Sequence, residues 1–217
     1  MSRLVCLLIG YCFGLFQTAY FYGKLKGIDI RTMGSGNAGT TNTLRVLGTK
    51  AGFIVLVGDI LKTVLAIALV RVWVVPHGNE WEYLLVMYTA AGSILGHNYP
   101  FYMQFKGGKG IAATAGLLFS FHPVLAVTGV AVFLLVFNLT HYVSLGSLTV
   151  YAVFLVQLIY MGQNGVFGSV EQVVLTEMYF LTFLLLLMAY WKHRENIVRL
   201  WKKEERKTYL FKKNQVK

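Results

Sequence analysis

Charged residues are scarce in this chain. Only 13% of its 217 residues are Asp, Glu, Lys or Arg, whereas a soluble domain carries about 25%. Cysteine is also rare, and the two present, Cys6 and Cys12, are six apart and match no metal-ligand spacing. These shortages exclude a soluble globular domain and a cysteine-based metal site.

Apolar residues make up 56% of the chain, and the mean hydropathy is +0.59, more apolar content than one small core can bury. We therefore expect an all-α integral membrane protein, with one polytopic domain over residues 1–201 and a basic cytoplasmic tail over residues 202–217. Pro123 disfavours helix at His122, so the apolar run 111–139 predicts two short helices joined by a tight turn. The seven expected spans are Leu4–Tyr22, Ala51–Val75, Tyr83–Leu95, the two helices within 111–139, Val143–Met161 and Val173–Trp191.

Basic residues lie mainly on one side of these spans. Seventeen of the 20 Lys and Arg residues fall in loops or ends of one side, and half of the 20 lie in residues 192–217. The positive-inside rule then places the N-terminus outside and the C-terminus in the cytoplasm. The basic tail is typical of a segment near anionic lipid, and no soluble domain accompanies it that would suggest nucleic-acid binding.

A polar segment follows the first span and reads Gly-Ser-Gly-Asn-Ala-Gly-Thr-Thr-Asn-Thr-Leu-Arg over residues 34–45. Its glycines let backbone amides turn toward a ligand, and its small hydroxyl and amide side chains add short donors. Arg45 adds a planar fork suited to phosphate or carboxylate. We predict an anion-binding loop, with a plain connector between spans as the alternative.

A second polar segment covers residues 96–110 and ends in Lys-Gly-Gly-Lys-Gly before the next helix. Lysines beside the free amides of a helix start make a phosphate site. The candidate binding residues are Lys106, Gly107, Gly108, Lys109 and Gly110. Ile111 stands where a Walker A loop needs Ser or Thr, so a nucleotide site is not expected, and a loop that only marks topology is the alternative.

The third polar segment, residues 192–199, follows the last span. If the helix continues there, His193 and Asn196 share a face, and Glu195 points elsewhere and is available to pair with an arginine. His193 is a candidate base, acid or phosphate donor. A positive-inside stop sequence is the alternative, but it does not account for Asn196. Because several spans are short, we expect the three cytoplasmic segments to be partly re-entrant and to converge.

Three polar side chains within the expected spans complete the candidate residues. Asp59 and Lys62, three apart in the second span, are expected to form an ion pair that supports the first polar segment. Ser144 either caps the sixth span or faces the site. The sequence shows no metal-ligand spacing and no catalytic triad, so we expect neither a metal nor a cofactor. Phosphate-binding chemistry recurs three times, which suggests two phosphate-bearing substrates or one large anion.

Together the three segments resemble the PlsY family, the membrane-integral bacterial glycerol-3-phosphate acyltransferases that use acyl phosphate. The resemblance rests on residues 34–45, 96–110 and 193–197 and covers nearly the whole chain. It implies transfer of a fatty acyl group from acyl phosphate to the 1-hydroxyl of sn-glycerol 3-phosphate, which gives lysophosphatidate and phosphate. This is the first acylation of phospholipid synthesis, at the cytoplasmic face of the bacterial inner membrane.

The resemblance also implies that Ser35, Arg45, His193 and Asn196 act in catalysis, that the loop 107–110 binds the acceptor phosphate, and that Glu195 is structural. An acyl phosphate is already activated, so positioning and charge neutralisation suffice without a covalent intermediate. We assign Ser35, Gly36 and Asn37 to the acyl phosphate, Arg45, Lys109 and His193 to glycerol 3-phosphate, Asn196 to its hydroxyls and Lys106 to either phosphate. His193 or a substrate phosphate takes the hydroxyl proton, and the acyl chain lies in a groove between spans that is open to lipid.

Two other functions fit part of the pattern. A transporter for a phosphorylated metabolite would also use several spans and cationic loops, but its polar groups would gather near the membrane midplane. An acyltransferase with a thioester donor would carry a His-x4-Asp pair, whereas Tyr102 and Val198 stand at that distance from His97 and His193. The expected partners are the two substrates and membrane lipid; the oligomeric state is left open, a monomer included.

Overall fold

A computed structural model of the chain describes residues 2–75 and 81–209. Residues 210–217 of the expected tail lie outside the described residues. The described part is helical: α1 (Ser2–Gly14), α2 (Thr18–Leu25), η1 (Ile30–Thr32), α3 (Thr40–Leu47), α4 (Thr49–Trp73), α5 (Glu82–Asn98), η2 (Phe101–Met103), α6 (Ile111–Phe121), α7 (Pro123–Thr140), α8 (Val143–Gln163), α9 (Gln172–Lys192) and α10 (Arg194–Trp201).

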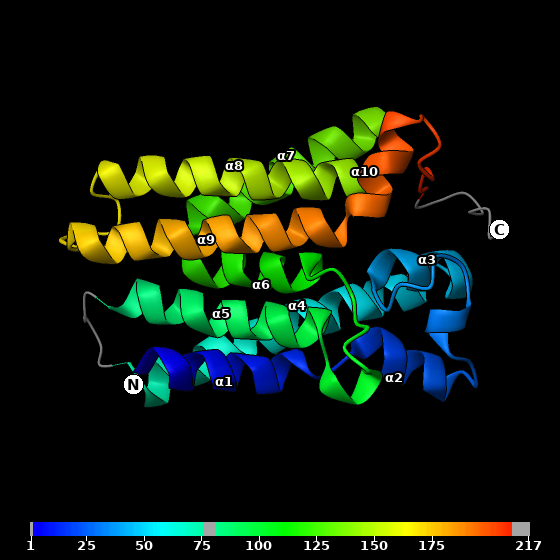
Figure 1. The fold of residues 1–217 in the computed structure, drawn as a ribbon, viewed down its shortest axis with the longest axis horizontal. Helices are drawn as coiled ribbons and strands as arrows, with labels where there is room; N and C mark the ends of the chain where they lie inside the picture. Colours follow the sequence, from blue (N-terminus) through cyan, green and yellow to red (C-terminus); the bar gives the residue numbers. More distant parts are fainter. Residues whose placement is uncertain (1, 76–80, 210–217) are drawn as a thin grey trace.

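The long helices lie side by side along one axis (Figure 1). Five segments of the described chain are long and apolar enough to cross a membrane: Ser2–Leu25, α4, α7, α8 and α9. α5 and α6 are shorter but lie within the same bundle. The all-helical fold with several apolar spans is therefore confirmed, whereas the number of seven crossings and their orientation stay predictions.

α1 and α5 approach each other closely through glycines on both helices. A Cβ added at Gly10 would overlap the Thr89 carbonyl, and one at Gly92 would overlap the Leu7 carbonyl. Gly14 and Gly96 repeat this relation one turn further along. Small residues four apart let two helix backbones touch. Membrane helices often pack in this way, because in lipid there is no hydrophobic driving force for helix association.

The expected first span, Leu4–Tyr22, is not one continuous helix. α1 ends at Gly14, and α2 begins at Thr18. The Gln17 side chain is buried and donates to the carbonyls of Gly14, Gly96 and His97 at 3.1, 3.3 and 3.1 Å. Lys62 of α4 donates to the carbonyls of Gly14 and Phe16 at 3.3 and 2.8 Å. The prediction of one continuous first span is therefore wrong. The break is stable because side-chain donors, among them Lys62 from a distant helix, satisfy the backbone carbonyls that it leaves free.

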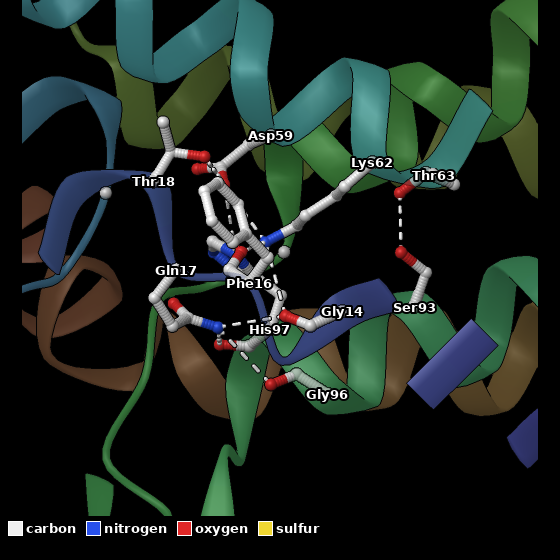
Figure 2. A network of polar contacts seen from close by, with 12 residues as sticks. Gly14, Phe16, Gln17, Thr18, Asp59, Lys62, Thr63, Ser93, Gly96 and His97 are labelled. Carbon is white, nitrogen blue, oxygen red and sulfur yellow. Dashed lines mark hydrogen bonds and ion pairs between the residues drawn. The ribbon is translucent and has the colours of Figure 1, made fainter. Parts of the chain in front are cut away.

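The expected ion pair between Asp59 and Lys62 is confirmed, at 3.0 Å between Oδ1 and Nζ, with both side chains buried. Figure 2 shows the pair among its neighbours. Thr18 Oγ1 donates to Asp59 at 2.9 Å, and Lys62 Nζ lies 2.7 Å from Nδ1 of His97. These bonds hold the break between α1 and α2 and the His97 ring in place. Because His97 lies in the second polar segment, the ion pair contacts that segment and not the first one, which it was expected to support.

The predicted break at His122 is confirmed. α6 ends at Phe121 and α7 begins at Pro123, with His122 in an extended conformation between them. Its Nδ1 accepts from the backbone amide of Val124 at 3.2 Å and so caps α7. Proline at the first helical position suits this start, because its missing N–H needs no partner there.

Candidate active site

The three polar segments meet at one end of the bundle, where α3, α10 and the start of α6 come together (Figure 1). They line one cavity of about 1110 Å³. The predicted residues on its wall are Ser35, Gly36, Asn37, Arg45, Asp59, Lys106, Gly107, Lys109, Gly110, Ser144, His193, Glu195 and Asn196. The expected convergence of the segments is therefore present in the structure.

The first segment forms a loop held by Asn42, a residue that sequence reasoning did not single out. The Asn42 side chain is buried, accepts from the amide of Ser35 at 2.8 Å, and donates to the carbonyls of Ile30 and Met33 at 3.0 Å each. Gly34 has φ +59°, which suits glycine at this turn. Because the Ser35 amide is already bonded, the group that Ser35 presents to the cavity is its exposed hydroxyl.

The second segment packs its glycines against the end of α5. The amides of Gly107 and Gly108 donate to the carbonyls of Asn98 and His97 at 3.2 and 3.1 Å, so they are engaged within the protein. A Cβ at Gly108 would overlap the His97 ring, which explains why this position needs glycine. The groups left for an anion are the lysine side chains and the first backbone amides of α6, because the first amides of a helix have no hydrogen-bond partner within that helix. Lys109 is half-buried, whereas Lys106 is exposed at the rim.

The third segment is not a continuation of α9. The helix ends at Lys192, and His193 has φ −102° before α10 begins at Arg194. Nδ1 of His193 lies 2.8 Å from the Ala189 carbonyl, so Nδ1 carries the hydrogen and Nε2 is left as an acceptor. Asn196 is buried, and its Oδ1 accepts from Lys109 Nζ, which joins the second and third segments directly.

The arginine pairing that the sequence suggested for Glu195 is present but loose. Its carboxylate lies 3.8 Å from Arg199, and its side chain is 75% exposed, so the pair contributes little to stability. The close carboxylate partner of Arg199 is Glu205, at 2.8 Å.

Glu205 and Thr208 are site residues that the sequence analysis missed. The Glu205 carboxylate accepts from Ser144 at 2.9 Å and from Asn196 at 2.6 Å. Arg45 donates to the Thr208 hydroxyl at 2.7 Å and to the Arg206 carbonyl at 3.1 Å. Glu204 and Glu205 lie within a run of basic residues, and nothing in the sequence marks either as buried, so the whole tail was expected to lie near anionic lipid.

Burial sets the charge states in the cavity. It lowers the pKa of Lys109 to about 8. Burial, followed by the positive charge of Lys109, lowers the pKa of His193 to about 4, so its imidazole is neutral at pH 7. Burial opposes ionisation of Glu205, but its hydrogen bonds from Arg199, Asn196 and Ser144 outweigh this and lower its pKa. At the polar end of the cavity a cationic Lys109 therefore lies beside the neutral imidazole of His193 and the Glu205 carboxylate.

The other end of the cavity is an apolar groove between α6, α7 and α8. Its wall is made of alkyl and aromatic side chains, namely Leu118, Phe119, Val130, Phe133, Leu134 and Phe137. A cationic end continuous with an apolar groove suits an amphipathic molecule with an anionic head.

Comparison with known proteins assigns the family. The family model described as glycerol-3-phosphate acyltransferase matches residues 4–203. A glycerol-3-phosphate acyltransferase of Geobacillus kaustophilus is 38% identical over 95% of this chain and 96% of its own length. That of Halalkalibacterium halodurans is 41% identical over 93% of each chain.

Solved structures agree with the sequence relatives. The crystal structure of PlsY, an integral membrane glycerol 3-phosphate acyltransferase, in its glycerol 3-phosphate form matches with a TM-score of 0.81 and 30% identity over 98% of this chain and all of that one. Its lysophosphatidic acid form matches with a TM-score of 0.79 over 97% of each chain. The chain therefore belongs to the glycerol-3-phosphate acyltransferase family that includes PlsY, and it is an integral membrane acyltransferase of phospholipid biosynthesis.

Proposed function

We propose that this enzyme transfers a fatty acyl group from acyl phosphate to the 1-hydroxyl of sn-glycerol 3-phosphate and forms 1-acyl-glycerol 3-phosphate and inorganic phosphate. The observation that carries the proposal is the single cavity that joins a cationic end to an apolar groove. Both substrates carry a phosphate, and the donor also carries an acyl chain. The PlsY forms with glycerol 3-phosphate and with lysophosphatidic acid support this choice of acceptor and product class.

The positions of the cavity residues support the following roles. Arg45 and Lys109 bind the phosphate of glycerol 3-phosphate, and Asn196, which Lys109 contacts, orients the glycerol hydroxyls. The Ser35 hydroxyl, with Gly36 and Asn37, binds the phosphate of the donor. Lys106 at the rim serves either phosphate, and the amides at the start of α6 add partial positive charge.

The reaction needs no enzyme-bound intermediate. The acceptor hydroxyl attacks the carbonyl carbon of the acyl phosphate, the bond from that carbon to the bridging oxygen breaks, and phosphate leaves. Positioning and neutralisation of both phosphates supply the rate enhancement. The neutral Nε2 of His193, or an oxygen of the departing phosphate, accepts the hydroxyl proton.

The membrane orientation is part of the proposal. We place the N-terminus outside, the C-terminus inside, and the cavity at the cytoplasmic face of the bacterial inner membrane, with seven crossings. The start of α1 and the whole of α10 lie at opposite ends of the long axis, which supports an odd number of crossings (Figure 1). Seventeen of the 20 basic residues then face the cytoplasm.

The donor is tested with purified protein in lipid nanodiscs and glycerol 3-phosphate. Palmitoyl phosphate is added in one set of tubes and palmitoyl-CoA in another, and phosphate and lysophosphatidate are measured together. We expect both products in equal amounts from palmitoyl phosphate, none from palmitoyl-CoA, and loss of turnover in Ser35→Ala. Turnover with palmitoyl-CoA would overturn the donor, and no turnover with either donor would overturn the proposed reaction.

A further inference from the structure

The chain returns to the cavity after α10. Lys203 has φ +58°, and the amide of Glu204 donates to the carbonyl of Arg199 at 2.8 Å, which reverses the backbone direction. The amide of Thr208 then donates to the carbonyl of His141 at 2.9 Å, at the junction of α7 and α8. We name residues 204–208 the C-terminal strap. Figure 1 shows this segment at the same end of the bundle as α3.

Glu205 is the buried residue of this strap that carries a negative charge. It is 9% exposed, and its carboxylate accepts from Ser144, Asn196 and Arg199 at 2.6–2.9 Å. Two further strap oxygens, the Arg206 carbonyl and the Thr208 hydroxyl, accept from Arg45. The strap therefore engages donors from three separate parts of the cavity wall.

Two of these donors are assigned to glycerol 3-phosphate, Arg45 to its phosphate and Asn196 to its hydroxyls. At both donors the strap puts an oxygen acceptor where a substrate oxygen would accept, and the one at Asn196 belongs to the Glu205 carboxylate. Each donor hydrogen bonds one acceptor well, and the Glu205 carboxylate repels a phosphate bound beside it. Binding of one therefore requires the other to leave.

We propose that the C-terminal strap competes with glycerol 3-phosphate for its phosphate subsite and that Glu205 sets the KM for this substrate. The inference rests on the proposed function, which gives Arg45 and Asn196 to the acceptor. The strap occupies the subsite in the free enzyme and leaves when the acceptor binds. The family model matches residues 4–203, so the strap lies beyond the residues that it matches.

The kinetic test compares Glu205→Gln with Glu204→Gln. Glu204 is the neighbouring strap carboxylate and is exposed, so its variant carries the same change in net charge without a cavity contact. Removing the competing charge opens the subsite: if the strap is closed in about 70–90% of free molecules, the KM for glycerol 3-phosphate falls about three- to tenfold. We expect kcat to stay within about twofold and the KM for acyl phosphate to stay unchanged, with no effect of Glu204→Gln.

Two other outcomes of this kinetic test would overturn the proposal. A lower kcat or a higher KM in Glu205→Gln would show that Glu205 positions Asn196 for catalysis, and it would overturn the competition. A fall in the KM for acyl phosphate alone would place the strap in the donor subsite and overturn the assignment. Wild-type turnover of glycerol 3-phosphate is measured first, so failure of the proposed function is seen separately from failure of the strap.

A second measurement needs no variant. Hydrogen exchange of peptides that cover residues 204–209 is followed in the wild-type protein with glycerol 3-phosphate, with inorganic phosphate and with glycerol. We expect faster exchange with both phosphates, since the Thr208 amide loses its bond to His141, and no change with glycerol. Slower exchange with glycerol 3-phosphate would mean that the strap closes over the substrate, and the proposal would be wrong.

Discussion

The buried pair of Asp59 and Lys62 provides the sharpest test of how the helices are held. Replacement of Lys62 by Met keeps a long apolar side chain but leaves the Asp59 carboxylate buried, at 1% exposure, with the Thr18 hydroxyl as its remaining close donor. It also removes the donor that Lys62 gives to the Gly14 and Phe16 carbonyls at the break between α1 and α2. The change therefore creates an uncompensated charge and exposed backbone acceptors at once.

The expected loss is large. Breaking a buried ion pair by removing one partner costs about 3–5 kcal/mol. For a chain of this size, each kcal/mol corresponds to roughly 2–4 °C in Tm, so Lys62→Met is expected to lower Tm by roughly 6–20 °C. The double variant Asp59→Asn/Lys62→Met removes both charges, and we expect it to recover about half of the loss, because the backbone carbonyls stay without their donor.

These shifts in Tm are measured by thermal unfolding in detergent, with a fluorescence signal that does not depend on reaction with cysteine. Lys50→Met is the matched control, because Lys50 is an exposed lysine near the start of the same helix. Its expected effect is within about 0.5 kcal/mol. If Lys62→Met is as stable as the Lys50 control, or if the double variant is less stable than Lys62→Met, the paired-charge reasoning is refuted.

Three other predictions concern charge state and packing. Because the pKa of Lys109 is about 8, its positive charge is lost as pH rises through that value, so the KM for glycerol 3-phosphate should rise between pH 7 and 9.5, and Lys109→Arg should abolish this rise. An unchanged KM in the wild type would contradict it. Because His193 has a pKa of about 4, the part of the kcat/KM profile that His193→Gln removes should fall as pH drops through about 4; a histidine-specific inflection near 6.5 would argue against a buried neutral ring. Gly92→Leu forces a side chain into the backbone of α1 and should cost about 1–3 kcal/mol, measured as a lower Tm, whereas an unchanged Tm would mean that α1 and α5 are not in contact.

The sequence predicted the features that depend on neighbouring residues. Pro123 carries its own backbone restriction, so the break at His122 could be placed to the residue. Asp59 and Lys62 are three apart on one helix, so their ion pair followed from spacing and from the cost of charge in a span. Convergence of the three polar segments followed from their common side of the membrane.

The features that were missed depend on distant parts of the chain. The break after Gly14 is stabilised by Lys62, which is 48 residues away, and a single glycine in an apolar run does not by itself predict that a helix ends. Residues 192–199 contain neither Gly nor Pro, so the end of α9 at Lys192 had no local signal. Burial of Glu205 is created by contacts with Ser144 and Asn196, which only the folded chain brings together.

The most direct test of the proposed reaction follows the bridging oxygen of the donor. Palmitoyl phosphate labelled with heavy oxygen between the acyl carbon and phosphorus is turned over with glycerol 3-phosphate by the purified protein, and the products are analysed by mass spectrometry. Attack at the acyl carbon leaves the label in the released phosphate, in an amount equal to the lysophosphatidate formed. Label in free palmitate, or phosphate released without lysophosphatidate, would contradict acyl transfer from acyl phosphate in this cavity.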